Sequence, residues 1–231
     1  MKYNNIVKGR FVSRPNRFIA KVIINGKEEN VHVKNTGRCK EILVSDAVVY
    51  LTKASGSQRK TQYDLIAVEK KTENRTILIN IDSQIPNACA EEFLPHSGLF
   101  SENLTLKREV KYGNSRFDIF AHDGERRAFI EVKGVTLEKN GKALFPDAPT
   151  QRGIKHIKEL IKAKNEGYEA YIIFIIQMDE VHSFSPDSET HPDFAFALKE
   201  AADSGVNILA YKSSVTPDSI EINSPVEVNL T

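Results

Sequence analysis

The 231-residue chain contains no tryptophan, only two cysteines and no long hydrophobic segment. Its longest apolar run covers residues 171–176, which is far too short to cross a bilayer. No apolar segment follows the first five residues, so the N-terminus does not have the pattern of a signal peptide. These absences predict a soluble, cytoplasmic protein and argue against a membrane partner.

The two cysteines, Cys39 and Cys89, lie fifty residues apart, and neither belongs to a CxxC pair or to a cluster with histidine. This spacing argues against a zinc site and against a disulfide framework. We therefore expect two reduced thiols, as is usual in cytosolic proteins.

Acidic residues are scarce near the N-terminus. Residues 1–80 contain sixteen Lys and Arg against seven Asp and Glu, whereas residues 81–176 contain fourteen of each class. Residues 177–231 contain two basic and ten acidic side chains. The basic first segment suggests contact with a polyanion, although an ordinary solvated surface explains the charge equally well.

The first eighty residues have the pattern of a small all-β domain. Five runs rich in β-branched residues occur at 18–24, 31–33, 47–51, 63–68 and 76–80. Asn25-Gly26, after the first run, is a strong hairpin signal. Such strands suit a closed barrel like the OB-fold, which commonly binds oligonucleotides. An SH3-like barrel and an open sheet remain alternatives, and we place this domain at residues 1–82.

Residues 83–231 alternate between strand and helix patterns, which predicts an α/β sandwich as the second domain. The expected elements are a hinge at 83–87, helices at 88–93, 150–165 and 192–203, strands at 104–112, 116–121, 128–135, 171–176 and 206–211, and a hairpin at Asn140-Gly141. Gly167 is expected to end the second of these helices. The continuous apolar strand at 171–176 fits a sheet that is covered on both faces.

Two neighbouring strands of the second domain place charged side chains at matching positions. Asp118 lies in the 116–121 strand, and Glu131 and Lys133 lie in the 128–135 strand. Because alternate residues of a strand share a face, Glu131 and Lys133 point the same way. One tight turn separates the two strands, so antiparallel pairing is expected to bring Asp118 and Glu131 together.

These three side chains suit the metal-dependent hydrolysis of a phosphodiester. The carboxylates of Asp118 and Glu131 can hold Mg²⁺ or Mn²⁺, hard cations that prefer oxygen ligands. Such an ion acidifies water and polarises a phosphoryl oxygen. The ammonium of Lys133 can stabilise the developing charge, and the neighbouring carboxylates favour its charged form. A Glu-x-Lys triplet alone also fits the wet face of an edge strand.

This arrangement resembles the PD-(D/E)xK nuclease superfamily, whose core order is helix, three strands, helix and strand. Asp118 matches the first acidic position, and Glu131 and Lys133 match the (D/E)xK element. Phe117 stands where that pattern has proline, a departure that leaves the match in place.

Longer motifs are spread over the whole chain. They are Gly9-Arg10-Phe11, Arg14-Pro15-Asn16-Arg17-Phe18, Asn35-Thr36-Gly37-Arg38, Ser115-Arg116-Phe117-Asp118, Phe145-Pro146-Asp147-Ala148-Pro149-Thr150-Gln151-Arg152-Gly153 and Lys155-His156. These motifs are similar to those of the sugar fermentation stimulation protein A family. The resemblance implies a DNA-binding protein that joins an OB-like N-terminal domain to a nuclease-like C-terminal domain. The family name records a phenotype in sugar metabolism and names no reaction.

Basic and aromatic residues alternate near the N-terminus. Arg10, Arg14 and Arg17 are interleaved with Phe11 and Phe18, a combination that suits backbone contact and base stacking on DNA. The alternative is that the phenylalanines belong to the core and the arginines are solvated.

Further candidate DNA contacts are Asn35 and Arg38, in a loop that can hold a phosphate, and Ser115 and Thr150. A plain turn is the alternative for the loop. Thr150 is also placed to cap the following helix.

Four residues are possible accessory groups at the site. Arg116 shares a strand face with Asp118 and can contact the scissile phosphate, and Glu109 can act as a third acidic group. An ion pair between Glu109 and Arg116 is the alternative. Arg152 and His156 lie one helical turn apart, and His156 can donate to a phosphate or act as a proton donor, or can be an ordinary surface histidine.

The sequence therefore supports a DNA-binding protein with a divalent-metal-dependent nuclease site. A non-catalytic, DNA-binding transcriptional regulator linked to sugar metabolism is the alternative. RNA is a further possible partner, because OB-folds do not separate DNA from RNA by sequence. The oligomeric state is left open.

Overall fold

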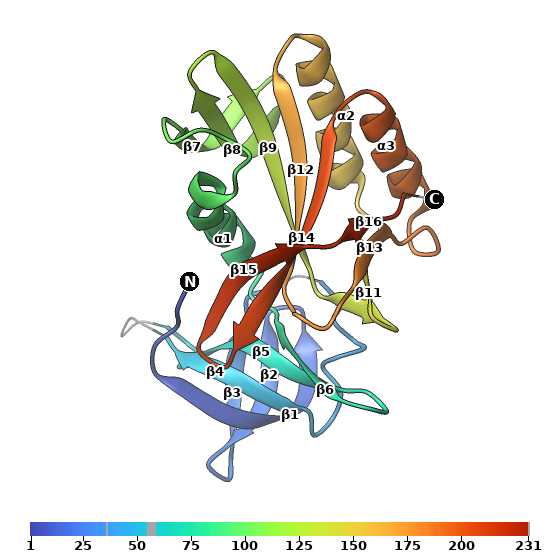
Figure 1. The fold of residues 1–231 in the computed structure, drawn as a ribbon. Coiled ribbons are helices and arrows are strands. Elements are labelled where there is room, and N and C mark those ends of the chain that lie inside the picture. The colour runs from blue at the N-terminus through green and yellow to red at the C-terminus, as the bar shows by residue number, and fades with distance from the viewer. Residues whose placement is uncertain (36, 55–58, 231) are drawn as a thin grey trace.

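The computed structural model describes residues 1–35, 37–54 and 59–230 of the chain. Figure 1 shows a β-barrel formed by the N-terminal residues, in blue to cyan, and an α/β unit formed by the rest of the chain. The hairpin of β14 (Asn207–Thr216) and β15 (Ser219–Pro225), in red, reaches from the α/β unit toward the barrel (Figure 1). No helix in the described part of the chain is long and apolar enough to span a membrane.

Six strands form the N-terminal sheet. They are β1 (Ile6–Asn16), β2 (Ile19–Ile24), β3 (Lys27–Val33), β4 (Val48–Lys53), β5 (Tyr63–Lys71) and β6 (Thr76–Asn80). Their order is β3-β2-β1-β4-β5-β6, and an additional pairing between β3 and β5 closes the first five strands into a barrel. The predicted OB-like barrel is therefore confirmed, and the open-sheet alternative is wrong.

The sequence pattern does not predict β1, although this strand has 11 residues. Register shifts against β2 occur between Phe11 and Ser13 and between Ser13 and Asn16. These irregularities interrupt the alternation of buried and exposed side chains that marks a regular strand. Arg10 and Arg14 therefore lie on a strand whose pairing with β2 is irregular, and Arg17 lies in the turn that follows it.

The other elements form the α/β unit. In chain order they are α1 (Ile85–Phe93), the 3-10 helix η1 (Leu94–His96), β7 (Thr105–Tyr112), β8 (Ser115–Asp123), β9 (Arg126–Val135), β10 (Leu137–Lys139), β11 (Lys142–Phe145), α2 (Gln151–Asn165), β12 (Glu169–Ile176), β13 (Ser183–Pro186), α3 (Pro192–Asp203), β14, β15 and β16 (Glu227–Val228). The main sheet has the order β15-β14-β12-β9-β8-β7, and β10, β11, β13 and β16 form a smaller sheet. Helix α1 packs on one face of the main sheet, and α2 and α3 pack on the other (Figure 1). The predicted α/β sandwich is confirmed.

Some boundaries differ from the prediction. Helix α1 begins at Ile85, so the expected hinge at 83–87 is partly helical. Pro86 lies in the first turn, where a helix does not need its missing N–H. The short strands β13 and β16 were not predicted, because they pair in parallel with distant segments and no local pattern marks them.

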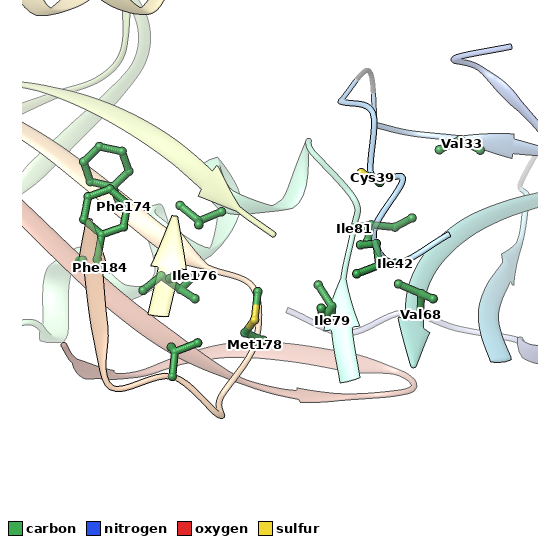
Figure 2. Packing of buried hydrophobic residues seen from close by; sticks show 14 of the residues in the cluster. Val33, Cys39, Ile42, Val68, Ile79, Ile81, Phe174, Ile176, Met178 and Phe184 are labelled. Atoms are coloured by element: carbon green, nitrogen blue, oxygen red, sulfur yellow. The ribbon is translucent and has the colours of Figure 1, made fainter. Parts of the chain in front are cut away.

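The barrel and the α/β unit share one hydrophobic cluster. Figure 2 shows Ile79 and Ile81 from the barrel side, and Ile176 and Met178 from the end of β12, within this cluster. Gln177 lies between the two units, and its buried Nε2 donates to Asn80 Oδ1 at 3.0 Å and to the carbonyl oxygen of Asp82 at 3.1 Å. These contacts hold the two units together. The domain boundary that we place between residues 82 and 83 stays a prediction.

A buried ion pair also joins the two units. Lys70 of β5 contacts the carboxylate of Glu138 in β10, whose side chain is 3% exposed, and the backbone N–H of Gly141 donates to the same carboxylate. Burial alone would raise the pKa of Glu138, but these hydrogen bonds outweigh it and lower that pKa below its ordinary value. The resulting stabilisation is complete above the ordinary pKa of a glutamate and is lost as the pH falls through the lowered pKa.

Replacing Glu138 by Ala should therefore lower the free energy of unfolding by about 3 kcal/mol at neutral pH, because it leaves Lys70 in a largely buried position without its partner. Urea denaturation at neutral pH and at a pH below the lowered pKa measures this effect, which should shrink in acid. Glu189→Ala is a control, since that carboxylate is 87% exposed and pairs with Lys139 at 3.8 Å. An equal loss at both pH values would contradict the prediction.

Candidate active site

Asp118 lies where the main-chain ladder between β8 and β9 ends. The ladder runs to Ile119 opposite Ile130, and the next pair in the same register is Asp118 and Glu131. Oδ2 of Asp118 accepts a hydrogen bond of 2.9 Å from the backbone N–H of Val132. The antiparallel pairing expected from the sequence thus places the two carboxylates opposite each other on neighbouring strands.

Asn87 of α1 holds the other oxygen of Asp118. Its Nδ2 donates to Asp118 Oδ1 at 2.9 Å. Burial raises the pKa of Asp118 and the nearby charge of Glu131 raises it further, while the N–H of Val132, Lys133 and Asn87 act in the opposite direction. The protein thus holds two carboxylates together against their repulsion, which a bound cation would relieve.

Glu131 is buried, with 2% of its surface exposed. Its Oε1 contacts the ammonium of Lys133 and Nδ1 of His156. Burial alone would raise the pKa of Glu131, but the hydrogen bond from His156 and the charge of Lys133 outweigh it and lower that pKa. The other oxygen, Oε2, is buried and has no hydrogen-bond partner among the described residues. A buried carboxylate oxygen in this state is costly unless a ligand satisfies it.

His156 connects Glu131 to Arg152, one turn earlier in α2. Nε of Arg152 lies 3.4 Å from Nε2 of His156. An arginine can only donate, so Nε2 accepts and the ring proton of His156 lies on Nδ1, which faces Glu131. Both ring nitrogens therefore contact protein groups, and His156 is placed to orient Glu131. A direct action of His156 on phosphate stays a prediction.

Asp118 and Glu131 supply oxygens of the kind that Mg²⁺ and Mn²⁺ prefer. Within residues 1–35, 37–54 and 59–230, no group of three or more His, Cys, Asp and Glu is arranged to hold a metal ion. A site with two carboxylates still suits Mg²⁺, because this ion commonly keeps several waters and uses one or two carboxylates. The unpartnered Oε2 of Glu131 also fits this ion.

The candidate residues near Asp118 on β7 and β8 differ in exposure. Arg116 and Glu109 form an ion pair of 3.2 Å in which the side chains are 65% and 59% exposed, so the ion-pair alternative holds for this pair. Ser115 is buried, and its Oγ has no hydrogen-bond partner in the described part of the chain. Contact of Ser115 or Arg116 with DNA stays a prediction.

In the barrel, Arg14 shapes the loop that follows β3. Its guanidinium donates to the backbone carbonyl oxygens of Arg17, Asn35, Gly37 and Arg38 at 2.6 to 2.8 Å. These bonds occupy the donors of its two terminal nitrogens, so a phosphate would have to compete with the loop for them, while the buried Nε has no hydrogen-bond partner among the described residues.

The other basic and aromatic residues of β1 and its turn differ in exposure. Arg10 contacts the backbone and carboxylate of Asp46. The guanidinium of Arg17 lies over the ring of Phe18, 4.7 Å from its centroid. Phe18 is 45% exposed whereas Phe11 is buried, so the core alternative holds for Phe11 alone.

The loop after β3 reaches the α/β unit. Asn35 bonds the carbonyl oxygen of Ile81 through Nδ2 and the N–H of Gly37 through Oδ1, and the backbone N–H of Arg38 donates to Asp147 Oδ2 at 3.1 Å. Thr36 lies outside the described residues. The loop is therefore held between the two units.

Thr150 caps α2, because its hydroxyl accepts a hydrogen bond of 3.0 Å from the N–H of Gly153. The predicted start of this helix is confirmed. A contact between Thr150 and DNA stays a prediction.

Comparison with known proteins shows to which family the chain belongs. A family model described as the sugar fermentation stimulation protein RE domain matches residues 84–219, and one described as the SfsA N-terminal OB domain matches residues 12–81. The chain belongs to the sugar fermentation stimulation protein family. The resemblance of the longer sequence motifs to this family is therefore confirmed, and the nuclease-like character of the second domain stays a prediction.

Full-length relatives of this family support the assignment. A sugar fermentation stimulation protein homolog of Desulfitobacterium hafniense is 54% identical over 100% of this chain and 99% of its own length. A homolog of Clostridium beijerinckii is 51% identical over 100% of both chains. A structure of Pyrococcus furiosus SfsA in complex with Ca²⁺ matches with a TM-score of 0.86 at 31% identity, over 99% of this chain and 98% of that one.

Two residues make contacts that the sequence did not predict, Asn87 with Asp118 of the site and Asp147 with the loop after β3. Asn87 fell within the expected hinge, and Asp147 belonged to a recognised motif without an assigned role. Their partners, Asp118 and the N–H of Arg38, lie 31 and 109 residues away in the chain. A polar residue in the first turn of α1 was a weak signal for Asn87, whereas no local signal marked the contact of Asp147.

Proposed function

We propose that this protein is a divalent-metal-dependent nuclease whose barrel binds nucleic acid and whose α/β unit hydrolyses a phosphodiester bond. The observation that supports this function best is the arrangement around Glu131. A buried carboxylate with one unpartnered oxygen lies beside a second carboxylate, Asp118, and beside an ammonium, Lys133.

Asp118 and Glu131 would hold Mg²⁺ or Mn²⁺, and the ion would supply an acidified water and a polarised phosphoryl oxygen when bound. Asn87 and the N–H of Val132 fix the carboxylate of Asp118. His156, itself contacted by Arg152, fixes the carboxylate of Glu131. The Ca²⁺ named for the Pyrococcus furiosus relative supports an oxygen-ligand site for a divalent cation in this family.

Lys133 would stabilise the negative charge that develops on the phosphate. Its side chain is 20% exposed, so its ammonium is held by Glu131 on one side and can meet substrate on the other. The excess of basic over acidic residues in positions 1–80 supports DNA as the substrate of the whole molecule.

A non-catalytic, DNA-binding regulator is the second candidate. The observation that favours it is the contact of Glu131 Oε1 with both Lys133 and His156, because this network is also a stable arrangement without any reaction. In that case the α/β unit would be a docking surface. The two functions are separated by whether DNA is cleaved.

The test is incubation of the full chain with linear, nicked and single-stranded DNA in Mg²⁺, in Mn²⁺ and in EDTA. We expect cleavage that requires a metal and that falls about 10²-fold in Lys133→Ala, because one preorganised charge on the phosphate is lost. Lys199→Ala, an exposed lysine of α3 that pairs with Asp203, should cleave at the wild-type rate. Cleavage that survives in Lys133→Ala would indicate a contaminating nuclease, and binding without cleavage in every metal would favour the regulator.

A further inference from the structure

Two cavities of the molecule meet at the loop after β3. The first, here called the basic pocket, has a volume of about 290 Å³ and is lined by Arg14, Arg17, Gly37, Arg38 and Lys40 among other residues of the barrel. The second, here called the inter-domain cavity, has a volume of about 300 Å³ and is also lined by Gly37. Gly37 therefore borders both cavities, and the surface that runs over this loop from one cavity to the other is here called the path.

The basic pocket is suited to an anionic ligand. Four of its lining residues are cationic, and no carboxylate lines it in the described part of the chain. Arg14 already donates to four backbone carbonyl oxygens, so its role is to fix the pocket's shape. Arg17, Arg38 and Lys40 are exposed and can contact successive phosphates.

An exposed aromatic ring lies at the edge of the basic pocket. Arg17 lines the pocket, and its guanidinium covers one side of the Phe18 ring at 4.7 Å. The ring is 45% exposed, which is unusual for phenylalanine in this chain. A phenylalanine beside arginines can stack on a nucleobase, whatever that base is. A base reaches such a ring only when it is free of a double helix.

The inter-domain cavity is lined by residues that are close in sequence to those of the candidate active site. It is lined by Gly134, which directly follows Lys133 in β9, and by Thr150, which caps α2. The same helix carries His156, which contacts Glu131. Asp147, whose carboxylate accepts the N–H of Arg38, lies on the wall between the two units.

Two glycines of this cavity lie close against polar side chains. A Cβ on Gly37 would lie 2.5 Å from Oδ2 of Asp147, and a Cβ on Gly134 would lie 2.5 Å from Oε1 of Gln177. Both distances are shorter than real contacts of a Cβ atom. A side chain at Gly37 would therefore displace the Asp147 carboxylate that accepts the N–H of Arg38, and one at Gly134 would displace the Gln177 amide that donates to Asn80.

We propose that this path binds a single-stranded nucleic acid, with phosphates in the basic pocket, a base stacked on Phe18 and the following nucleotide at the inter-domain cavity. The proposal deepens the proposed function and rests on it for the direction of the path toward the active site. A single strand fits because its bases are available for stacking and its backbone can follow a narrow, bent course. A duplex hides its bases and offers nothing to Phe18.

The test measures the binding of fluorescein-labelled oligothymidylate to the full chain by fluorescence anisotropy in EDTA, where no metal-dependent cleavage occurs. A hairpin duplex with the same number of nucleotides is the competitor. We expect the single strand to bind at least about 10-fold more tightly than the duplex, because base stacking adds to phosphate contact. Oligouridylate is the third probe: tighter binding of this probe would support the proposal with RNA as the strand.

Three variants give different expected signatures. Phe18→Ala should weaken oligothymidylate binding about 10-fold and leave the salt dependence unchanged, since it removes stacking alone. Arg38→Ala should reduce the slope of log affinity against log salt by about 0.7, the value for one phosphate contact on a single strand. Lys21→Ala is the charge-matched control, because this lysine, whose side chain is 41% exposed, pairs with Glu28 on the same barrel and lines neither cavity. It should change neither quantity.

Two results would overturn the proposal: equal binding of duplex and single strand, or Phe18→Ala and Arg38→Ala proteins that bind like Lys21→Ala. Hydrolysis of bis(p-nitrophenyl) phosphate in Mn²⁺ keeps the two proposals apart, because this small diester does not need the path. If Phe18→Ala loses strand binding but hydrolyses the small diester at the wild-type rate, the result supports binding of a single strand along the path. If neither the wild type nor any variant hydrolyses a diester, the proposed nuclease function is wrong. The anisotropy measurements still decide whether the path binds a single strand.

Discussion

Replacing Asp118 by Asn should lower the rate of DNA cleavage by about 10³-fold or more, which corresponds to about 4 kcal/mol of lost transition-state stabilisation. The substitution removes one of the two carboxylates proposed to hold the metal ion. Asp118 and Glu131 are the acidic pair at the site, so no neighbouring carboxylate in the described residues is placed to replace it. Single-turnover cleavage in saturating Mg²⁺ and Mn²⁺ measures the effect.

The same change should leave the thermal stability equal to or above that of the wild type. Burial and the charge of Glu131 raise the pKa of Asp118, which means that the folded protein disfavours its ionised form. A neutral amide removes this repulsion. It can still accept the N–H of Val132 through its oxygen, and the Asn87 amide can turn so that its own oxygen accepts the new NH₂ group. Differential scanning calorimetry at neutral pH measures the transition temperature.

Asp123→Asn is the matched control, because Asp123 lies on the same strand and is buried. Its carboxylate accepts bonds from Ser101 and Arg126, and these bonds hold its pKa below the ordinary value. The control should therefore lose stability and retain the cleavage rate, the reverse of Asp118→Asn. An Asp118→Asn protein that cleaves DNA normally would remove the basis of the two-carboxylate site.

Replacing Phe174 by Ala should lower the free energy of unfolding by about 4 kcal/mol, since a fully buried aromatic ring leaves a cavity that its neighbours cannot fill. Phe174 is 0% exposed in the middle of β12. Its ring stacks on Phe184, with the centroids 4.1 Å apart, and lies 5.5 Å from Phe145 (Figure 2 shows the first pair). Urea denaturation followed by circular dichroism measures the loss.

The control is Phe196→Ala on α3, whose ring is 73% exposed and whose removal should change stability by less than about 0.5 kcal/mol. The hydrophobic cluster of Phe174 extends through Ile176 and Met178 to Ile79 of the barrel. The Phe174→Ala protein should therefore still unfold in one transition, at a lower urea concentration. A barrel that unfolds separately from the α/β unit would contradict this shared core.

Local patterns predicted the elements whose signals lie within a few residues. The helix at 192–203 matches α3, and the hairpin signals at Asn25-Gly26 and Asn140-Gly141 lie between β2 and β3 and between β10 and β11. Hydrophobic periodicity and turn residues act over such short distances, so they are visible in the sequence. Less regular segments such as β1 gave no such signal, because bulges break the alternation.

The pairing register of β8 and β9 decides which charged residues meet at the candidate site, and this part of the site was predictable. Asp118, Glu131 and Lys133 come from two strands joined by a tight turn, so their spacing alone indicated that they approach one another. The burial and the hydrogen bonds of these three side chains were not predictable from the sequence. Whether Glu131 is exposed on an edge strand or buried in a central one depends on β12, which pairs with β9 from 41 residues further along the chain.

The sequence by itself determined the two-part architecture, the basic character of the first part and the identity of the acidic pair with its lysine. Only the tertiary structure decided that Arg14 is used to build a loop, that Glu131 keeps one buried oxygen without a partner among the described residues, and that the barrel loop meets Asp147 of the α/β unit. The physical reason is that these features arise from contacts between segments far apart in the chain. Burial and competition for hydrogen bonds are properties of the packed molecule, and no short stretch of sequence specifies them.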